Sequence, residues 1–267
     1  MIENPKTPRI RRAAALARKK DRLATQKFVA EGVQAVYEAL RFAPGDIEVI
    51  YATHAGRERA TELDRLANDA CVQLEMVSEQ VFAVLTDTVT PQGVAAIMQM
   101  RNTQLQEALQ NAKLVAVLHE VRDPGNAGAV LRAADAAGAD AVIFSGDCID
   151  PWHPKVVRST TGSLFHLPVS YGCDLSEVIK AAQQAGLGTI AADVRGSDIS
   201  PTEALLQNPT AWIFGNEAHG LSASDRDKCD AVRRLPLFGA AESLNLATAA
   251  TVCLYVSAFA HAEGSKN

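Results

Sequence analysis

The sequence is poor in the patterns that mark metal-binding, disulfide-linked and repetitive proteins. Its five cysteines form no CxxC pair and stand at no zinc-ligand spacing from a histidine, which argues against a metal site and for a reducing compartment. There is no internal repeat, and the composition, 48% hydrophobic and 21% charged, excludes a disordered or collagen-like chain. No apolar signal segment opens the sequence, so the cytoplasm is the expected location.

Charged residues are missing from one long stretch near the C-terminus. Between Ser243 and Ala262 there is no Asp, Glu, Lys or Arg, and the stretch is long enough in principle to span a bilayer. It contains Asn245, Thr248 and His261, however, and is rich in Ala rather than in Leu or Ile. We expect a buried core or interface helix here and no membrane span.

Positive charge is concentrated at the N-terminus, although the whole chain has a net charge of −5. The first 27 residues hold nine Lys or Arg and two acidic residues, so this segment is +7 and the remainder is −12. A basic segment on an acidic protein is typical of a polyanion-binding surface, and a solvated helix face is the alternative. The nine cations are Lys6, Arg9, Arg11, Arg12, Arg18, Lys19, Lys20, Arg22 and Lys27.

Apolar runs alternate with helix-like stretches, which is typical of an α/β protein with a mostly parallel sheet. We expect strands at residues 47–53, 71–77, 93–100, 114–121, 141–145, 167–171, 187–194, 212–214 and 232–237. We expect helices at residues 9–23, 32–41, 57–68, 127–137, 175–185 and 244–260. The polar stretch Arg101–Lys113 reads as a connector, which divides the chain into an N-terminal domain, residues 1–105, and a C-terminal domain, residues 106–267.

The first loop of chemical interest follows the apolar run 114–121 and opens an Ala-rich helix. Residues 123–126, Asp-Pro-Gly-Asn, form a tight turn, and the helix start after it favours anions. Arg132 then lies in an otherwise apolar helix, either as a surface residue or as an anion ligand. The same strand–turn–helix order, with Asp147 about twenty residues further on, also suits a dinucleotide-binding fold, but the GxGxxG fingerprint is absent.

The second loop, residues 213–222, ends an apolar strand with Gly215, Asn216 and Glu217. Glycines at the carboxyl end of a strand let a ligand approach the backbone. Glu217 either orients a substrate or caps the loop, and His219 is either a base or a solvated bystander.

The third loop, residues 235–245, runs into the uncharged stretch near the C-terminus. Ser243 or Asn245 suits the N-cap position of the helix that follows. A loop that lies against a buried helix start could instead wrap its backbone around a small molecule.

Together and in this order, the three loops resemble the motifs of the SpoU/TrmH branch of the SPOUT methyltransferases. The first motif, D-P-x-N-x-G-x-x-x-R, is matched by Asp123, Pro124, Asn126, Gly128 and Arg132. The second, F-G-x-E-x-x-G-L, is matched by Phe214, Gly215, Glu217, Gly220 and Leu221. The third, P-x-x-G-x-x-x-S-L-N, is matched by Pro236, Gly239, Ser243, Leu244 and Asn245. The N-terminal part resembles, more loosely, the substrate-binding domain attached to many such enzymes.

The resemblance implies a fold and a reaction. The fold would be an α/β knot, a mostly parallel C-terminal sheet closed by a trefoil knot, with a smaller N-terminal ribosomal-protein-like α/β domain. The reaction would be S-adenosylmethionine-dependent methylation of a ribose 2′-hydroxyl in RNA by a cytoplasmic homodimer without a metal. Ribosomal RNA is favoured because the N-terminal domain resembles those of ribosomal RNA enzymes.

The resemblance also implies site residues, residue by residue. The catalytic group would be Arg132, Asn126, Glu217, Ser243 and Asn245. The cofactor would lie against Ala191, Asp193, Gly215, Asn216, Leu235, Leu237, Ser243 and Leu244. RNA would be held by Arg9, Arg11, Arg12, Arg18, Lys19, Lys20, Arg22 and Arg158, although Arg158 also suits the cofactor carboxylate. A guanidinium essentially never deprotonates, so we expect Arg132 to clamp a phosphate and stabilise the developing alkoxide rather than act as the base.

Several alternatives stay open. The RNA could be transfer RNA, the first loop could belong to an NAD-dependent oxidoreductase, or the chain could be a catalytically inactive RNA-binding protein. Leu246 and Ala247 stand where the family often has Val-Ser, which removes one hydroxyl near the site. The sequence does not name the nucleotide, the proton acceptor, or a housekeeping as opposed to an antibiotic-resistance role.

Overall fold

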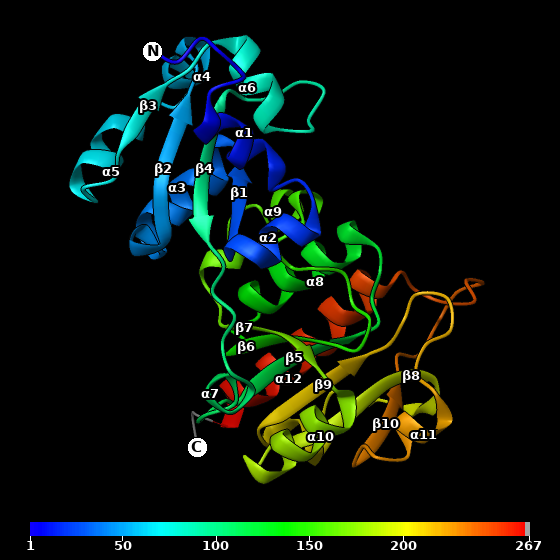
Figure 1. Cartoon of the computed structure of the whole chain (residues 1–267). Helices are drawn as coiled ribbons and strands as arrows, with labels where there is room; N and C mark the ends of the chain where they lie inside the picture. Colours follow the sequence, from blue (N-terminus) through cyan, green and yellow to red (C-terminus); the bar gives the residue numbers. More distant parts are fainter. Residues whose placement is uncertain (265–267) are drawn as a thin grey trace. The chain divides into compact units, whose positions relative to one another are not determined.

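A computed structural model describes residues 1–264, which fold into two compact units (Figure 1). The N-terminal unit consists of Met1–Arg101 together with a later segment, Trp152–His166. The C-terminal unit consists of Asn102–Pro151 and the chain from Leu167 onward. The polypeptide therefore passes between the units three times, and a stretch from the middle of the C-terminal sequence packs with the N-terminal unit.

The N-terminal unit is built on a four-stranded sheet in the order β1-β4-β2-β3. β1 (Lys27–Glu31) and β2 (Ile47–Ala52) pair antiparallel with β4 (Val94–Gln99), and β3 (Leu74–Met76) pairs parallel with β2. Apolar side chains of α1 (Pro8–Ala15) and α6 (Glu79–Leu85) pack on this sheet, Ile10 and Phe82 being fully buried. The remaining elements of the unit are α2 (Lys19–Thr25), α3 (Val33–Phe42), η1 (Pro44–Asp46), α4 (His54–Arg59), α5 (Leu63–Asp69), α9 (Pro154–Thr160) and η2 (Ser163–Phe165).

Three details of this unit differ from the sequence prediction. The helix expected at residues 9–23 is divided into α1 and α2 at Arg18, whose ψ of 132° is not helical. The buried Arg22 guanidinium donates to the carbonyl oxygens of Leu16 and Ala17, both at 2.9 Å, where α1 ends. These hydrogen bonds satisfy carbonyls that a helix end otherwise leaves unpaired. The helix expected at residues 57–68 breaks at Ala60, whose ψ of 71° is not helical. Strand β1 was not expected at all.

The C-terminal unit contains a six-stranded sheet in the order β10-β8-β9-β5-β6-β7, and every neighbouring pair is parallel. Its strands are β5 (Leu114–His119), β6 (Ala141–Ser145), β7 (Val169–Cys173), β8 (Gly188–Asp198), β9 (Thr210–Phe214) and β10 (Ala231–Arg234). Its helices are α7 (Leu105–Ala108), α8 (Pro124–Ala136), α10 (Leu175–Gln184), η3 (Ala204–Gln207), α11 (Ala223–Arg226) and α12 (Leu246–Gly264). The predicted α/β fold with a mostly parallel sheet is confirmed, and the trefoil knot stays a prediction.

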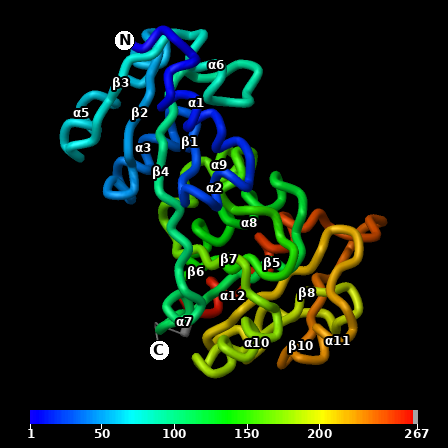
Figure 2. Tube along the Cα trace, in the orientation of Figure 1, coloured from blue at the N-terminus to red at the C-terminus, as the bar shows by residue number. Residues whose placement is uncertain are grey.

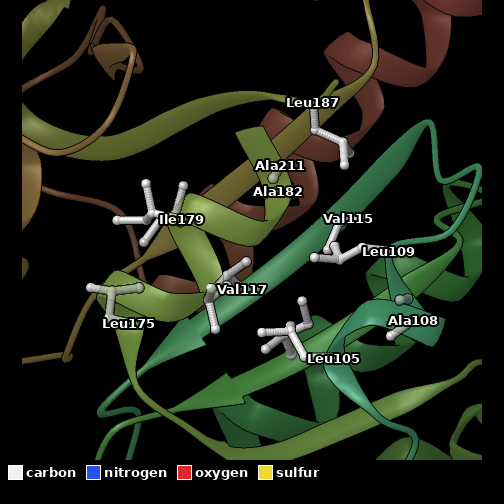
Figure 3. Packing of buried hydrophobic residues seen from close by; sticks show 14 of the residues in the cluster. Leu105, Ala108, Leu109, Val115, Val117, Leu175, Ile179, Ala182, Leu187 and Ala211 are labelled. Atoms are coloured by element: carbon white, nitrogen blue, oxygen red, sulfur yellow. The ribbon is translucent and has the colours of Figure 1, made fainter. Parts of the chain in front are cut away.

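The core of this unit lies between the sheet and the helices that cover it. Leu105 of α7 and Leu175 and Ile179 of α10 pack against Val115 and Val117 of β5 (Figure 3). Helices α8 and α12 pack against each other and against β5. The parallel strands are thus buried by helices, as such sheets require.

The uncharged stretch near the C-terminus forms α12, which begins at Leu246 rather than at the expected residue 244. By length and composition alone, the 18 residues Leu246–Glu263 could cross a membrane. The helix nevertheless packs on the sheet, where the Trp212 indole donates to Ser257 Oγ at 2.9 Å and the Tyr255 hydroxyl donates to the carbonyl of Ala136 at 3.2 Å. These contacts place one face of α12 against the sheet and α8, whereas only 28% of Leu246–Glu263 is buried, so the helix fits the predicted core or interface helix.

Strand order places a switch point between β5 and β9. After β5 the chain moves to β6 on one side, whereas after β9 it moves past β8 to β10 on the other side (Figure 2). After the carboxyl ends of these two neighbouring strands, the chain therefore continues to opposite sides of the sheet. Such places in parallel sheets are where ligands bind. The first loop follows β5 and the second follows β9.

Candidate active site

The first loop is fixed by the start of α8. The Asp123 carboxylate accepts the backbone N–H of Asn126 at 2.7 Å, which makes Asp123 the N-cap, and Pro124 follows in the first helical turn. Both residues suit these positions because the cap satisfies an otherwise unpaired N–H and proline has no N–H to satisfy. Asn126 is thereby held in the first turn, where it is half-buried.

Glu217 joins the second loop to the first. Its carboxylate accepts the backbone N–H groups of Asp123 at 3.0 Å and Arg122 at 3.2 Å, and the side-chain amide of Asn126 at 3.2 Å. Partial desolvation raises the pKa of Glu217, but these donors and its own backbone N–H outweigh it and hold the pKa below the ordinary value. Glu217 is therefore an ionised acceptor that clamps the first loop, as the capping interpretation predicts.

Asn126 joins the first loop to the third. Its side-chain oxygen accepts the amide of Asn245 at 2.9 Å, while its nitrogen donates to Glu217. Asn245 in turn accepts the backbone N–H groups of Ala247 at 2.9 Å and Thr248 at 3.4 Å, so it caps α12. The three loops are thus connected by one chain of hydrogen bonds, Glu217–Asn126–Asn245, which we call the amide bridge.

Arg132 lies on α8 among buried apolar neighbours, with its own side chain exposed. Within residues 1–264 it forms no hydrogen bond and no ion pair. An exposed guanidinium without a protein partner can bind a phosphate with paired N–H groups.

The second loop is held close to its own backbone. Asn216 donates to the carbonyl of Glu120 at 2.8 Å and accepts the N–H of Ala218 at 2.9 Å. A Cβ atom at Gly215 would lie 2.5 Å from the carbonyl carbon of Gly220, so only glycine fits there. His219 is exposed, and its ring contacts Asn216 at 3.2 Å.

Asp193 supports this loop from β8. Its carboxylate is almost fully buried and forms ion pairs with Arg195 at 3.3 Å and Arg226 at 3.5 Å. Arg226 also donates to the carbonyl of Leu221 at 2.5 Å, which ties α11 to the second loop. Sequence reasoning missed Arg226, because no motif residue marks it and its partner is 33 positions away.

The third loop is open. Within residues 1–264, no hydrogen bond joins residues 235–244 to the rest of the chain. Leu237 and Leu244 are 39% and 40% exposed, Phe238 is 96% exposed, and Ser243 is also exposed. The backbone polar groups of this loop are therefore available to a ligand. Ala191, by contrast, is buried in β8 beside Ile213.

The basic residues at the N-terminus occupy different environments. Arg9 pairs with Glu75, Arg18 pairs with Asp21, and Lys27 pairs with Glu48. Six cations predicted to contact RNA are exposed, namely Arg9, Arg11, Arg12, Arg18, Lys19 and Lys20. A shallow hollow of about 450 Å³ lies beside them, lined by Pro5, Arg11, Ala14, Ala15, Arg18 and Val84.

Two predicted RNA contacts are engaged by acceptors within the N-terminal unit, one of them buried and the other half-buried. Arg22 is 1% exposed and holds the end of α1. Arg158, on α9, pairs with Glu31 at 3.1 Å and with Asp87 at 2.5 Å inside the N-terminal unit. No group of three or more His, Cys, Asp or Glu side chains that could hold a metal ion occurs within residues 1–264.

This geometry is that of an α/β methyltransferase of the SPOUT class, in which three loops meet at the switch point of a parallel sheet. Residues 113–255 match the model of the SpoU rRNA Methylase family, and residues 7–96 match that of the MRM3-like substrate binding domain. The chain belongs to the SpoU rRNA Methylase family. The predicted family, and with it the enzyme class of S-adenosylmethionine-dependent RNA 2′-O-methyltransferases, is confirmed.

Individual relatives agree over nearly the whole chain. The 23S rRNA (guanosine(2553)-2′-O)-methyltransferase RlmP of Bacillus subtilis (strain 168) is 34% identical over 95% of this chain and 97% of its own length. An AdoMet-bound rRNA methyltransferase from Sinorhizobium meliloti superimposes with a TM-score of 0.83 and 30% identity, covering 96% of both chains. The SpoU methyltransferase AviRb from Streptomyces viridochromogenes, in complex with the cofactor AdoMet, gives a TM-score of 0.82 and 28% identity over 97% of this chain and all of its own.

Proposed function

We propose that this enzyme methylates the 2′-hydroxyl of one ribose in 23S ribosomal RNA. The observation that carries the proposal is the amide bridge, which brings the first, second and third loops together on the unit that carries the unpaired Arg132. The 23S rRNA named as the substrate of two relatives, one matching 95% and the other 87% of this chain, supports ribosomal RNA over transfer RNA.

Arg132 is proposed as the catalytic cation. A ribose hydroxyl is a weak nucleophile at neutral pH, so the site must align it and stabilise the charge that develops on its oxygen. The exposed guanidinium of Arg132 suits both tasks, by gripping a neighbouring phosphate and facing the forming alkoxide. Asn126, Glu217, Ser243 and Asn245 would hold the ribose and the loops. The proton acceptor would be a group other than Arg132, because an arginine stays protonated.

The third loop is the proposed cofactor site. S-adenosylmethionine, when bound, supplies the electrophilic methyl group. Residues 235–244 offer backbone donors and acceptors that no described residue uses, and Gly215 allows the second loop to fold back on Gly220. Gly215, Asn216, Leu235, Leu237, Ser243 and Leu244 would hold the cofactor, with Ala191 and Asp193 supporting the site from β8. Exposed apolar side chains beside free backbone amides suit a ligand with both an adenine ring and a charged tail.

The N-terminal domain, residues 1–105, is proposed to bind the RNA, and residues 106–267 to carry the methyltransferase site. Six exposed cations on and around α1 and α2, with the hollow beside Arg11 and Arg18, would grip the phosphate backbone. Arg22 and Arg158 would act through the fold of this unit, since their guanidinium groups are engaged by protein acceptors.

A knotted homodimer in the cytoplasm completes the proposal. Val252 and Phe259 leave 40% and 64% of their surfaces exposed on α12, which suits an apolar interface between two copies. The cytoplasmic location is proposed from the ribosomal RNA named as the substrate of the relatives.

Calorimetry with S-adenosylmethionine, run beside NAD, tests the cofactor, and methyl transfer to protein-free 23S RNA tests the reaction. Micromolar binding of S-adenosylmethionine alone and a 2′-O-methyl mark at one ribose are expected. Transfer RNA is the matched control substrate. Methylation of transfer RNA in place of 23S RNA would overturn the substrate proposal, and NAD binding in place of S-adenosylmethionine would overturn the cofactor proposal.

A further inference from the structure

The connection between β6 and β7 leaves its own sheet. Adjacent parallel strands are joined by a crossover, whose helix normally packs on the sheet it connects. Here the crossover helix α9 packs beside β1 of the N-terminal unit instead (Figure 1). We call residues 152–166, which include α9 and η2, the strap. Both of its ends continue into the C-terminal unit, one of them just before the edge strand β7.

Arg158 makes the central contact of the strap. One of its terminal nitrogens lies 3.1 Å from Glu31 Oε2 and 2.5 Å from Asp87 Oδ1. Glu31 ends β1 and is 7% exposed, and it also accepts the Thr88 hydroxyl at 2.8 Å. Burial raises the pKa of Glu31, whereas the hydrogen bond from Arg158 is the main cause that lowers the pKa of Asp87. The cation therefore ties the end of β1 to the loop of residues 86–93.

The far end of the strap is fitted to α3. His166 Nε2 lies 3.1 Å from Glu38 Oε2, and the ring of Phe165 stacks on Phe28 with centroids 6.5 Å apart. Gly162 has a φ of 107°, and a Cβ atom there would lie 2.5 Å from Glu38 Cγ. The strap thus contacts the rest of the N-terminal unit through a His–Glu side-chain contact, a ring pair and a close approach of Gly162 to Glu38.

We propose that the strap fixes β1 and the loop of residues 86–93 within the N-terminal unit, and that Arg158 is a positioning residue for RNA rather than an RNA ligand. The RNA part of this inference rests on the proposed function. Arg158 holds the end of β1 to the loop 86–93 in the same unit that carries the exposed cations of α1 and α2, so its loss would loosen the unit on which RNA is proposed to bind. The cofactor loops belong to the other unit and contain none of these contacts.

Opposite charges on the two partners make a sharp test. In the full-length enzyme, Arg158→Met and Asp87→Asn remove the same ion pair from its two sides. Each variant is expected to raise the KM for RNA about fivefold or more and to leave kcat and S-adenosylmethionine binding within about twofold. The double variant should raise the KM for RNA no further than Arg158→Met alone. Arg158→Lys, which keeps the charge, should retain most of the RNA affinity. Lys155→Met, an exposed cation on the same helix, is the control and should change nothing.

An RNA ligand at position 158 gives the opposite pattern. Asp87→Asn would then free a cation and tighten RNA binding, and Arg158→Met would lower the slope of log affinity against log salt by about one phosphate contact. Either result, or an unchanged KM in both variants, overturns the proposal.

Hydrogen exchange of residues 86–93 supplies a second readout that needs no RNA. Faster exchange in Arg158→Met and Asp87→Asn, but not in Lys155→Met, supports the strap even if 23S RNA proves not to be the substrate. Unchanged exchange in both variants overturns it.

Discussion

The side-chain amide of Asn245 donates to the side-chain oxygen of Asn126 at 2.9 Å, across 119 positions of the sequence. Asn126 lies in the first turn of α8, whose N-cap is Asp123, and Asn245 caps α12. Side chains located at two helix starts therefore connect the loops of the candidate active site. Capping and catalysis, which compete as explanations of Asn245 in the sequence, are compatible in the structure.

Arg132→Ala is expected to lower kcat by about a hundredfold or more, because a cation aimed at developing charge acts mainly in the transition state. Since Arg132 has no protein partner within residues 1–264, the melting temperature and the affinity for S-adenosylmethionine should stay unchanged. Single-turnover methylation of 23S RNA measures the effect. Lys180→Ala, an exposed cation on α10, is the control. Full activity of Arg132→Ala would remove Arg132 from the catalytic group.

Asn126→Asp is expected to be more damaging than Asn126→Ala. The new carboxylate would face Glu217 where the amide now donates at 3.2 Å, and two ionised carboxylates repel each other. The deficit in melting temperature should shrink as the pH falls toward 4, where one of the two carboxylates takes up a proton. Equal melting temperatures of the two variants at neutral pH would contradict the amide bridge.

Glu217→Gln should reveal a pH-dependent contribution to stability. The pKa of Glu217 is held below its ordinary value of 4.5, so the folded state favours the ionised form. The stabilisation it gives is therefore fully present above pH 4.5 and is lost as the pH falls through the lower pKa of the folded state. Urea unfolding of the wild type and of Glu217→Gln between pH 3 and 7 measures this effect. The difference between their free energies of unfolding should widen with rising pH. A difference in free energy of unfolding that does not change with pH would show that hydrogen bonds to the ionised Glu217 carboxylate do not stabilise the fold.

Cations of the N-terminal segment should divide into two groups. Arg11→Gln and Lys20→Gln are expected to lower the slope of log RNA affinity against log salt by about one each, because exposed cations displace counterions from phosphates. Arg22→Met should instead lower the melting temperature, since its guanidinium holds the Leu16 and Ala17 carbonyls. Filter binding at four salt concentrations and thermal unfolding distinguish the two groups. A slope change in Arg22→Met that leaves stability intact would reverse its assignment.

Phe259→Glu is expected to convert a dimer into folded monomers, because it places a charge on the exposed apolar face of α12. Light scattering after gel filtration measures the mass, and circular dichroism checks the fold. Val89→Glu, at a residue that is 97% exposed in the N-terminal unit, is the matched control and should remain dimeric. A monomeric wild-type protein would end the homodimer proposal.

Periodicity and turn residues predicted most of the C-terminal sheet, because parallel strands buried by helices read as apolar runs such as 114–119 and 141–145. Three of the motif residues, Asn126, Glu217 and Asn245, lie in one hydrogen-bonded chain, as the combined motifs suggest. Residues that serve both the local fold and the site leave a local signature, which is why sequence reasoning found them.

Partners that are far away in the sequence could not be predicted in the same way. Nothing around Arg158 in the sequence indicates that its carboxylates are 127 and 71 positions away, so a cation before a strand was interpreted as a phosphate ligand. The sequence groups Arg22 with its basic neighbours as an RNA contact. It does not show that Arg22 alone is buried, because that depends on where α1 ends. Strand β1 follows directly after the basic segment and pairs antiparallel with β4, with Val29 opposite Ile97, 68 positions later. This pairing is set by tertiary structure, so the local sequence does not indicate it.

Because the third loop is open, binding of the cofactor to it is expected to raise the protein's resistance to proteolysis. Residues 235–244 gain no hydrogen bond from the described chain, so whatever occupies the loop must supply its order. Binding of a ligand to the folded state alone raises stability by RT ln(1 + [L]/Kd), about 2.7 kcal/mol at a hundredfold excess over Kd. A protease is therefore expected to cut the purified protein near Phe238, which is 96% exposed, and to spare it when S-adenosylmethionine is saturating.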